Sequence, residues 1–277
     1  MKEFSRALIL GGTGKTGSRI ASRLRQMGRT VRIGSRSADI PFDWDDPDTW
    51  EPVLKDIDAV YISFQPDLAV PGAVQAIRAF ATKAVGSGVQ KLVLLSGRGE
   101  PEAQECEKVI MGGGASWTIV RASWFCQNFS ESYMLEPILA GSLALPAGDI
   151  KEPFVDTDDI ADVAVAALTE EGHDGKVYEV TGPTLLTFKE AIDTIANAIG
   201  KPIHYQTVTI EEYAVALTSH GVPEGIVSLV SYLFSEVLDG RNACVTDGVE
   251  RALGRKATAF SAYVEKTVAT GIWNQGA

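Results

Sequence analysis

The chain has 277 residues, of which 45% are hydrophobic, and its formal net charge is −11. This length and hydrophobic content suffice for a large buried core in an α/β protein. The acidic balance argues against nucleic acid as the main partner, because phosphates repel a negative surface. No stretch approaches the ~18 apolar residues of a membrane span, and we expect no secretion signal ahead of the first strand.

Cysteines and histidines give no sign of a disulfide framework or a metal site. Cys106, Cys126 and Cys244 are odd in number and widely spaced, which is typical of reduced thiols in a cytoplasmic protein. The three histidines lack the spacing of metal ligands, so no metal is expected.

A glycine-rich segment separates the first expected strand, which ends at Leu10, from a helical pattern. Strand, tight turn and helix form the context of a dinucleotide-binding fingerprint, whose glycines let the backbone approach a pyrophosphate at a helix N-terminus. The glycines fit this fingerprint in two registers, starting at Gly11 or at Gly12. We expect phosphate contacts from the whole loop: Gly11, Gly12, Thr13, Gly14, Lys15, Thr16 and Gly17.

The Gly-Lys-Thr triplet at 14–16 also suggests a P-loop for nucleoside triphosphates. That motif needs a glycine five residues earlier, where this chain has Ile9 inside the strand. The loop is therefore too short to wrap a triphosphate, and the dinucleotide interpretation is favoured.

The second expected strand, 30–34, is followed by Ser35 and Arg36. In a dinucleotide fold this position faces the adenosine ribose, and a carboxylate there favours NAD. This chain has none, and Arg36 can pair with a 2′-phosphate through its charged donors. We therefore expect NADP(H), with an ordinary solvated arginine as the alternative.

Strands and helices alternate along the first half of the chain, as in a parallel sheet covered on both faces. The pattern predicts strands over 40–44, 59–64, 91–95 and 117–121, and helices ending near 54 and spanning 70–85 and 101–111. Further on it predicts a short strand at 154–155, a helix to about 168, strands over 177–180 and 203–206 around a helix over 187–199, and mostly helix from 209. We expect an α/β, Rossmann-type doubly wound parallel sheet over 1–150, with a strand and helix from about 151–180. A smaller, mostly helical substrate-binding part is expected over 181–277.

Ligands of open α/β sheets bind at the carboxyl ends of the strands. Candidate cofactor contacts at these ends, besides the loop and Ser35–Arg36, are Asp43, Trp44, Phe64, Gln65, Pro66, Ser96 and Gly97. Trp44 can stack on adenine, or it can close the core together with Phe42. The candidate acceptor pocket, which we expect beside the nicotinamide, consists of Trp124, Phe125, Asn128 and Phe129. The same aromatic residues equally suit a hydrophobic anchor between the core and the C-terminal part.

The glycine loop, Phe42-Asp43-Trp44, the strand 91–96 and the segment 117–129 resemble the NmrA-like branch of the atypical short-chain dehydrogenases/reductases. Residues 154–161 and 178–183 continue the resemblance. The N-terminal part is most like the festuclavine/agroclavine dehydrogenase-type enzymes, and the C-terminal part is similar to triphenylmethane and quinone reductases. The resemblance implies NADP(H) as the cofactor and hydride transfer as the activity. The branch also includes regulators without turnover.

One departure concerns the Tyr-x-x-x-Lys pair with which typical members of the wider superfamily protonate a carbonyl. None of the seven tyrosines has a lysine four residues later. We therefore expect reduction of a small conjugated or electron-poor acceptor, such as a quinone, an iminium or a cationic dye, with Ser96 as a weak catalytic candidate. The alternative is a silent NADP(H) sensor that acts through a protein partner. A homodimer is a candidate assembly, and Asp156, Asp158 and Asp159 are expected to cap a helix.

Overall fold

The computed structural model describes residues 6–274, so most of the segment from which we argued against a secretion signal lies outside it. The chain forms two compact units whose paths interleave. Unit 1 comprises residues up to Ala122 together with Thr157–Val180 and Asp247–Arg255, and unit 2 comprises Ser123–Asp156, Thr181–Thr246 and the chain from Lys256 onward. This division differs from the expected one: residues 123–150 belong to unit 2, and 247–255 return to unit 1.

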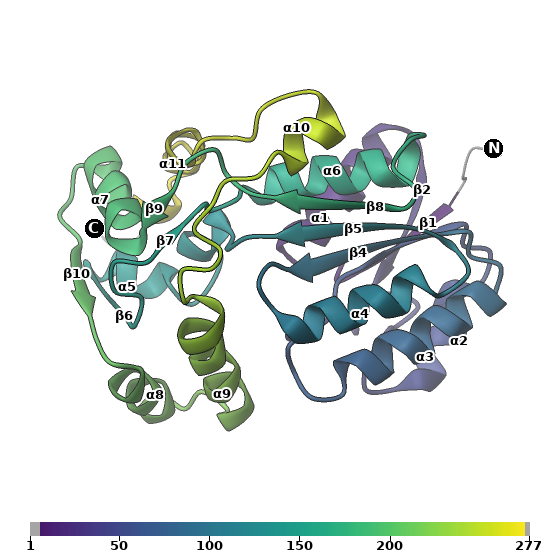
Figure 1. Cartoon of the computed structure of the whole chain (residues 1–277), viewed down its shortest axis with the longest axis horizontal. Helices are drawn as coiled ribbons and strands as arrows, with labels where there is room; N and C mark the ends of the chain where they lie inside the picture. Colours follow the sequence, from purple (N-terminus) through teal and green to yellow (C-terminus); the bar gives the residue numbers. More distant parts are fainter. Residues whose placement is uncertain (1–5, 275–277) are drawn as a thin grey trace. The chain divides into compact units, whose positions relative to one another are not determined.

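Unit 1 is built on a six-stranded, fully parallel sheet (Figure 1). The strand order is β2 (Thr30–Gly34), β1 (Arg6–Leu10), β3 (Ala59–Ile62), β4 (Lys91–Gly97), β5 (Ser116–Ala122) and β8 (Lys176–Val180). The chain order reverses between β1 and β3, which is the switch point where doubly wound folds bind dinucleotides. The predicted fold class is therefore confirmed.

Helices cover both faces of this sheet (Figure 1). On one face α1 (Lys15–Gln26) packs against α6 (Thr157–Thr169), and α6 also contacts α10 (Gly248–Leu253). On the other face lie α2 (Trp50–Leu54), α3 (Ala73–Gly86) and α4 (Pro101–Met111). The apolar positions of α1 face inward because Ile20, Ala21 and Leu24 recur at helical spacing and are buried.

Residues 40–44 do not form the short strand that the sequence predicts. Their only strand-like pairing is an isolated bridge between Asp43 and Asp46. The rings of Phe42 and Trp44 lie 5.0 Å apart edge to face, and both contact Phe80 of α3. The segment is held by this aromatic packing rather than by a hydrogen-bond ladder.

The acidic start of α6 is tied to two other segments of unit 1. Asp158 accepts hydrogen bonds from Arg23 of α1 at 2.8 Å, and Asp159 accepts from Arg255 at 2.7 Å. Both aspartates lie in the first turn of α6, where a negative charge also interacts favourably with the positive end of the helix dipole. The two aspartates therefore cross-link α1, α6 and the segment after α10, and the expectation that they cap the helix remains a prediction.

Unit 2 contains two small two-stranded sheets. β6 (Ser142–Leu145) pairs in parallel with β10 (His204–Thr207), and β7 (Lys151–Glu152) pairs antiparallel with β9 (Leu186–Thr187). Its helices are α5 (Leu135–Leu139), α7 (Phe188–Ile199), α8 (Ile210–Ser219), α9 (Glu224–Tyr232) and α11 (Phe260–Val268). The expected strand at 154–155 is only an isolated bridge between Phe125 and Val155. Capping boxes begin both α7 and α8, which explains why these two helices start where they do.

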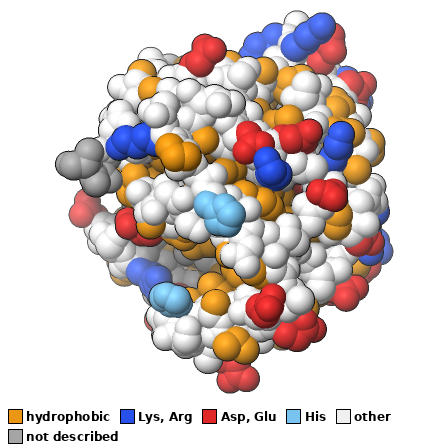
Figure 2. All heavy atoms as spheres, turned by 90° about the vertical axis from the view of Figure 1, so that its left-hand side faces the viewer, with side chains coloured by type: hydrophobic (Ala, Val, Ile, Leu, Met, Phe, Trp, Pro, Cys, Tyr) orange, Lys and Arg blue, Asp and Glu red, His pale blue; other side chains and the backbone are white. Residues whose placement is uncertain are grey.

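Acidic and basic side chains are interspersed on the face of the molecule that Figure 2 shows. Such a mixed surface does not form the basic stripe typical of nucleic-acid binding. Between residues 6 and 274, no helix is both long and apolar enough to cross a bilayer.

Candidate functional site

The loop between β1 and α1 presents a free helix N-terminus. Gly14 is the N-cap of α1, and no side chain caps the first turn. The loop is closed by a 2.9 Å hydrogen bond from the Gly14 N–H to the Gly11 carbonyl, and Gly11 has a φ of +63° that favours glycine. The uncapped N–H groups and the positive end of the dipole suit a phosphate.

The glycines of this loop are required for two different reasons. A Cβ on Gly17 would overlap the Gly11 carbonyl oxygen, and a Cβ on Gly12 would lie 2.8 Å from the Ile9 carbonyl oxygen. These two positions require glycine because a neighbouring backbone segment occupies the space that a side chain would need. A Cβ on Gly14 would meet only the Gly11 carbonyl oxygen, at 3.3 Å. Apart from this one tight contact, no protein atom lies within 4 Å of a Cβ at Gly14, as expected where a ligand approaches the backbone.

Thr16 is turned away from the expected phosphate site. It is buried, and its hydroxyl accepts a 2.9 Å hydrogen bond from the Tyr61 hydroxyl. Burial raises the pKa of Tyr61, so this hydroxyl keeps its proton and remains the donor. Only the backbone of Thr16 is then placed to contribute to phosphate binding.

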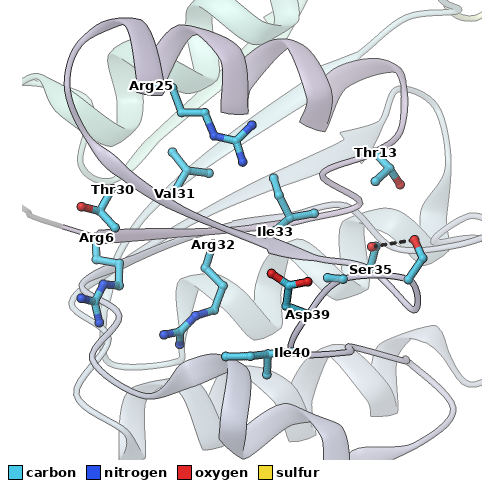
Figure 3. Close-up of a pocket in the computed structure, with 12 residues that line it drawn as sticks. Arg6, Thr13, Arg25, Thr30, Val31, Arg32, Ile33, Ser35, Asp39 and Ile40 are labelled. Atoms are coloured by element: carbon cyan, nitrogen blue, oxygen red, sulfur yellow. Dashed lines mark hydrogen bonds between the residues drawn. The ribbon is translucent and has the colours of Figure 1, made fainter.

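A groove of about 590 Å³ runs beside edge strand β2 (Figure 3). Thr13 of the glycine loop and Ser35 line it together, which joins the two segments that the sequence assigned to phosphate and ribose. Ser37, Asp39 and Arg25 also line the groove, and the sequence analysis missed them. Arg36 is exposed and is not among the lining residues, so any contact with a 2′-phosphate needs its side chain to turn inward.

The aromatic candidate Trp44 belongs largely to the core. Its ring packs 4.7 Å from that of Phe64 and 6.0 Å from that of Trp50, measured between centroids. Its indole N–H donates to the Ser63 carbonyl at 3.4 Å. This packing favours the structural interpretation, although the ring stays partly exposed. The predicted adenine contact by Asp43 and Trp44 remains a prediction.

Ser96 lies in a buried polar network at the carboxyl end of β4. Its hydroxyl donates to Glu107 Oε1 at 2.6 Å, and Glu107 in turn accepts two hydrogen bonds from Arg121, at 2.8 and 2.5 Å. Arg121 also donates to Glu179 at 2.6 Å. Because the carboxylate of Glu107 holds the hydroxyl, Ser96 is poorly placed to protonate an acceptor.

We expect Ser96→Ala to lower turnover by less than the ~10²-fold that marks the loss of a general acid. Steady-state kinetics on any acceptor that the wild type reduces will measure this change. A hundredfold or larger loss with unchanged NADPH affinity would show that the hydroxyl acts directly.

The remaining cofactor candidates lie after β3 and at the end of β4. Gln65 and Pro66 are exposed and joined by a cis peptide bond, and Phe64 is half-buried against Trp44. Gly97 ends β4, and a Cβ there would overlap the carboxyl group of Glu100. Glycine at this position leaves space for a buried carboxyl group that sequence reasoning did not single out.

The acceptor candidates all lie in unit 2. Trp124 is half-buried, and its ring is 4.9 Å from that of Phe234. Phe129 is fully buried in an aromatic cluster, with ring centroids 5.3 Å from Phe154 and 5.6 Å from Phe260. Phe129 therefore belongs to the aromatic core of unit 2. Trp124, Phe125, Asn128 and Phe129 remain predicted acceptor contacts.

The fold and the glycine loop define a protein of the Rossmann-type dinucleotide-binding class. The model of the NmrA-like family matches residues 102–267, more than half of the chain, and the protein therefore belongs to the NmrA-like family. No group of three metal-binding side chains is found within the described part of the chain.

Curated relatives match almost the whole chain. Prestalk A differentiation protein A of Dictyostelium discoideum is 27% identical over 94% of this chain and 91% of its own length. NAD(P)H azoreductase of Xenophilus azovorans is 29% identical over 93% of this chain and 96% of its own. Agroclavine dehydrogenase of Claviceps fusiformis is 29% identical over 93% of this chain and 95% of its own length. This match confirms the resemblance of the sequence to the agroclavine dehydrogenase-type enzymes.

Solved structures show the same fold. Citrobacter sp. triphenylmethane reductase in complex with NADP(H) superposes with a TM-score of 0.74 at 19% identity, over 95% of this chain and 99% of that one. NmrA, a negative transcriptional regulator, superposes with a TM-score of 0.73 at 13% identity, over 100% of this chain and 99% of that one.

Proposed function

We propose that this protein is an NADPH-dependent reductase that transfers hydride to a small conjugated or electron-poor acceptor of the quinone, iminium or cationic-dye type. The observation that carries the proposal is the loop at Gly14, where an uncapped helix N-terminus is left open beside a groove lined by Thr13 and Ser35. Relatives named as an azoreductase and a clavine dehydrogenase support the reductase class. The cofactor supplies the hydride, and the chain's own residues bind and orient it.

The residues present fit such a cofactor. The first turn of α1 offers backbone N–H groups to the pyrophosphate, and Ser35 offers a hydroxyl to the ribose side. No carboxylate directly follows β2, although Asp39, five residues after the strand ends, lines the same groove. Asp39 is exposed, so a cationic neighbour such as Arg36 is needed there to favour a 2′-phosphate.

A screen tests this proposal most directly. NADPH oxidation is followed spectrophotometrically with quinones, imines and cationic dyes, and NADPH affinity is measured in parallel by calorimetry. Turnover of at least one acceptor class together with NADPH binding is the expected result. Failure to bind either nicotinamide cofactor would overturn the proposal.

A silent NADP(H) sensor that acts through a protein partner is the second candidate. Two observations favour it: the shared fold with the NmrA regulator, and the hydrogen bond that ties Ser96 to Glu107. The same screen separates the two functions, because a sensor binds NADPH tightly without oxidising it in the presence of any acceptor.

Replacing Arg36 by alanine should remove most of the preference for NADPH over NADH. A lost charge-assisted contact costs about 1.5–3 kcal/mol, which corresponds to a roughly 10- to 150-fold weaker affinity for NADPH. Calorimetry with both cofactors measures the preference, and NADH affinity should change little. Arg78→Ala removes an equal charge from the exposed side of α3 and is the matched control. Equal wild-type affinities for the two cofactors would contradict the assignment.

A further inference from the structure

Strand β2 is an edge of the six-stranded sheet, so one of its sides has no neighbouring strand. Gly34 faces β1, because its carbonyl oxygen accepts a 3.0 Å hydrogen bond from the Gly11 N–H. The N–H and C=O groups of successive residues in a strand point alternately to its two sides. Val31 and Ile33 therefore direct theirs away from β1, and within residues 6–274 these groups have no hydrogen-bond partner.

The segment that the sequence predicts as the next strand does not cover this edge. Residues 40–44 pack instead in the aromatic cluster around Phe80. The Phe42 N–H donates to the Ser35 carbonyl at 3.0 Å, just beyond the end of β2. The groove described above runs along the strand itself, where residues 30–33 line it (Figure 3). The unpaired side of β2 is therefore open to this groove.

The groove extends beyond the part assigned to the dinucleotide. Thr13 and Ser35 lie at one end of β2, and Arg6 and Thr30 lie at the other. A strand of five residues spans about 16 Å at ~3.3 Å per residue. The far part of the groove thus has the length of a short extended segment.

Three arginines line this far part: Arg6, Arg25 and Arg32. Arg25, in the last turn of α1, is exposed and forms no ion pair with any residue between 6 and 274. Arg32 donates from Nη1 to the carbonyl oxygens of Val53 and Lys55, both at 2.7 Å. These acceptors are neutral, so the charge of Arg32 is not cancelled by them.

Two carboxylates lie near these arginines. Asp56 is 3.6 Å from Arg6, and Asp39 lines the groove near Ser35 (Figure 3). Arg25 and Arg32 therefore carry the positive charge of the far part, although the chain has a formal net charge of −11. A positive groove on an acidic protein favours a negatively charged ligand.

Arg25 and Arg32 lie on opposite faces of the sheet. Arg25 belongs to α1, whereas Arg32 reaches the end of α2, which covers the other face (Figure 3). Neighbouring side chains of an extended segment also point to opposite faces. Two consecutive acidic residues on one added strand can therefore each pair with one arginine. Two-fold pairing with β2 of a second copy would instead bring like charges together, which disfavours that occupant.

We propose that the open edge of β2 binds an extended protein segment with two consecutive acidic residues, which joins the sheet as a further strand. Hydrogen bonds to the backbone of Val31 and Ile33 supply affinity, and pairing with Arg25 and Arg32 supplies specificity. The inference is independent of the proposed reductase function, because the segment lies beyond the dinucleotide end of the groove.

The probe is the synthetic peptide acetyl-Thr-Val-Glu-Glu-Val-Thr-amide, which is titrated into the full-length protein by calorimetry. We expect binding that weakens as salt is added and that is lost when lysines replace both glutamates. A third peptide, N-methylated at its four central residues, keeps both charges but cannot donate hydrogen bonds from them. Its affinity should be about tenfold lower or less, because about two backbone bonds are lost.

A charge reversal tests the arginine pairing. Arg25→Glu should weaken binding of the acidic peptide by about tenfold or more. One of the two peptides with a single lysine in place of a glutamate should regain affinity for this variant. Arg78→Glu, an equal reversal on the exposed side of α3, is the matched control and should bind the acidic peptide like the wild type. Circular dichroism checks that both variants are folded.

Hydrogen exchange measured by NMR locates the bound peptide. The peptide should slow exchange of the Val31 and Ile33 amides, which point into the groove. The amides of Arg32 and Gly34 face β1 and should change little.

Four results would each overturn the inference: no binding of the acidic peptide, equal affinity for its N-methylated form, unchanged binding by Arg25→Glu, or unchanged exchange at Val31 and Ile33. Sedimentation of the protein without peptide tests the other occupant. A dimer in which these two amides are already protected would show that a second copy covers the edge, and would also overturn the inference.

Discussion

Gly14→Val is expected to abolish NADPH binding in a protein that stays folded. The backbone at Gly14 is extended, with φ −85° and ψ −177°, which a β-branched residue adopts without strain. Within the protein a Cβ would meet only the Gly11 carbonyl oxygen, at 3.3 Å, a tight contact that a shift of a few tenths of an ångström relieves. The added methyl groups would instead occupy the space of the pyrophosphate at the start of α1.

Calorimetric titration with NADPH and a urea unfolding curve together measure this result. Gly86→Val is the matched control, because a Cβ at Gly86, at the end of α3, meets nothing within 4 Å and the residue is exposed. The control should bind NADPH like the wild type. Wild-type affinity in a folded Gly14→Val protein would show that the dinucleotide does not lie on this loop.

Glu107→Ala is expected to have the largest effect on stability. Glu107 is 2% exposed and accepts two hydrogen bonds from Arg121 and one from Ser96. Removing one partner of a buried ion pair typically costs ~3–5 kcal/mol, and Arg121 keeps its bond to Glu179, so we expect a loss near the lower end, about 3 kcal/mol.

Urea unfolding followed by circular dichroism measures this loss of unfolding free energy. Glu105→Ala, which removes an exposed carboxylate two residues away on α4, should change it by less than about 0.5 kcal/mol. A Glu107→Ala variant as stable as this control would mean that the network does not hold α4 against β5.

Local signals in the sequence were sufficient for the architecture. The run ending at Leu10, the glycines after it and the apolar spacing of Ile20 and Leu24 predict β1, the loop and α1, because strand, turn and helix are each encoded over a few residues. The parallel sheet was predicted from the alternation of strands and helices along the first half of the chain. The same reasoning was wrong for 40–44, where aromatic side chains suggested a strand but pack as a cluster with Phe80.

The sequence alone also determined the family, because its characteristic motifs are short contiguous segments: the glycine loop and the segment 117–129. Only the tertiary structure decided the state of individual side chains. Thr16 lies 45 residues from its partner Tyr61, and Arg121 lies 58 from Glu179. Phe129 is buried by Phe154 and Phe260, which no local pattern links to it. Arg121 meets Glu179 only because β5 and β8 are neighbours in the sheet, so the state of these side chains is a property of the fold.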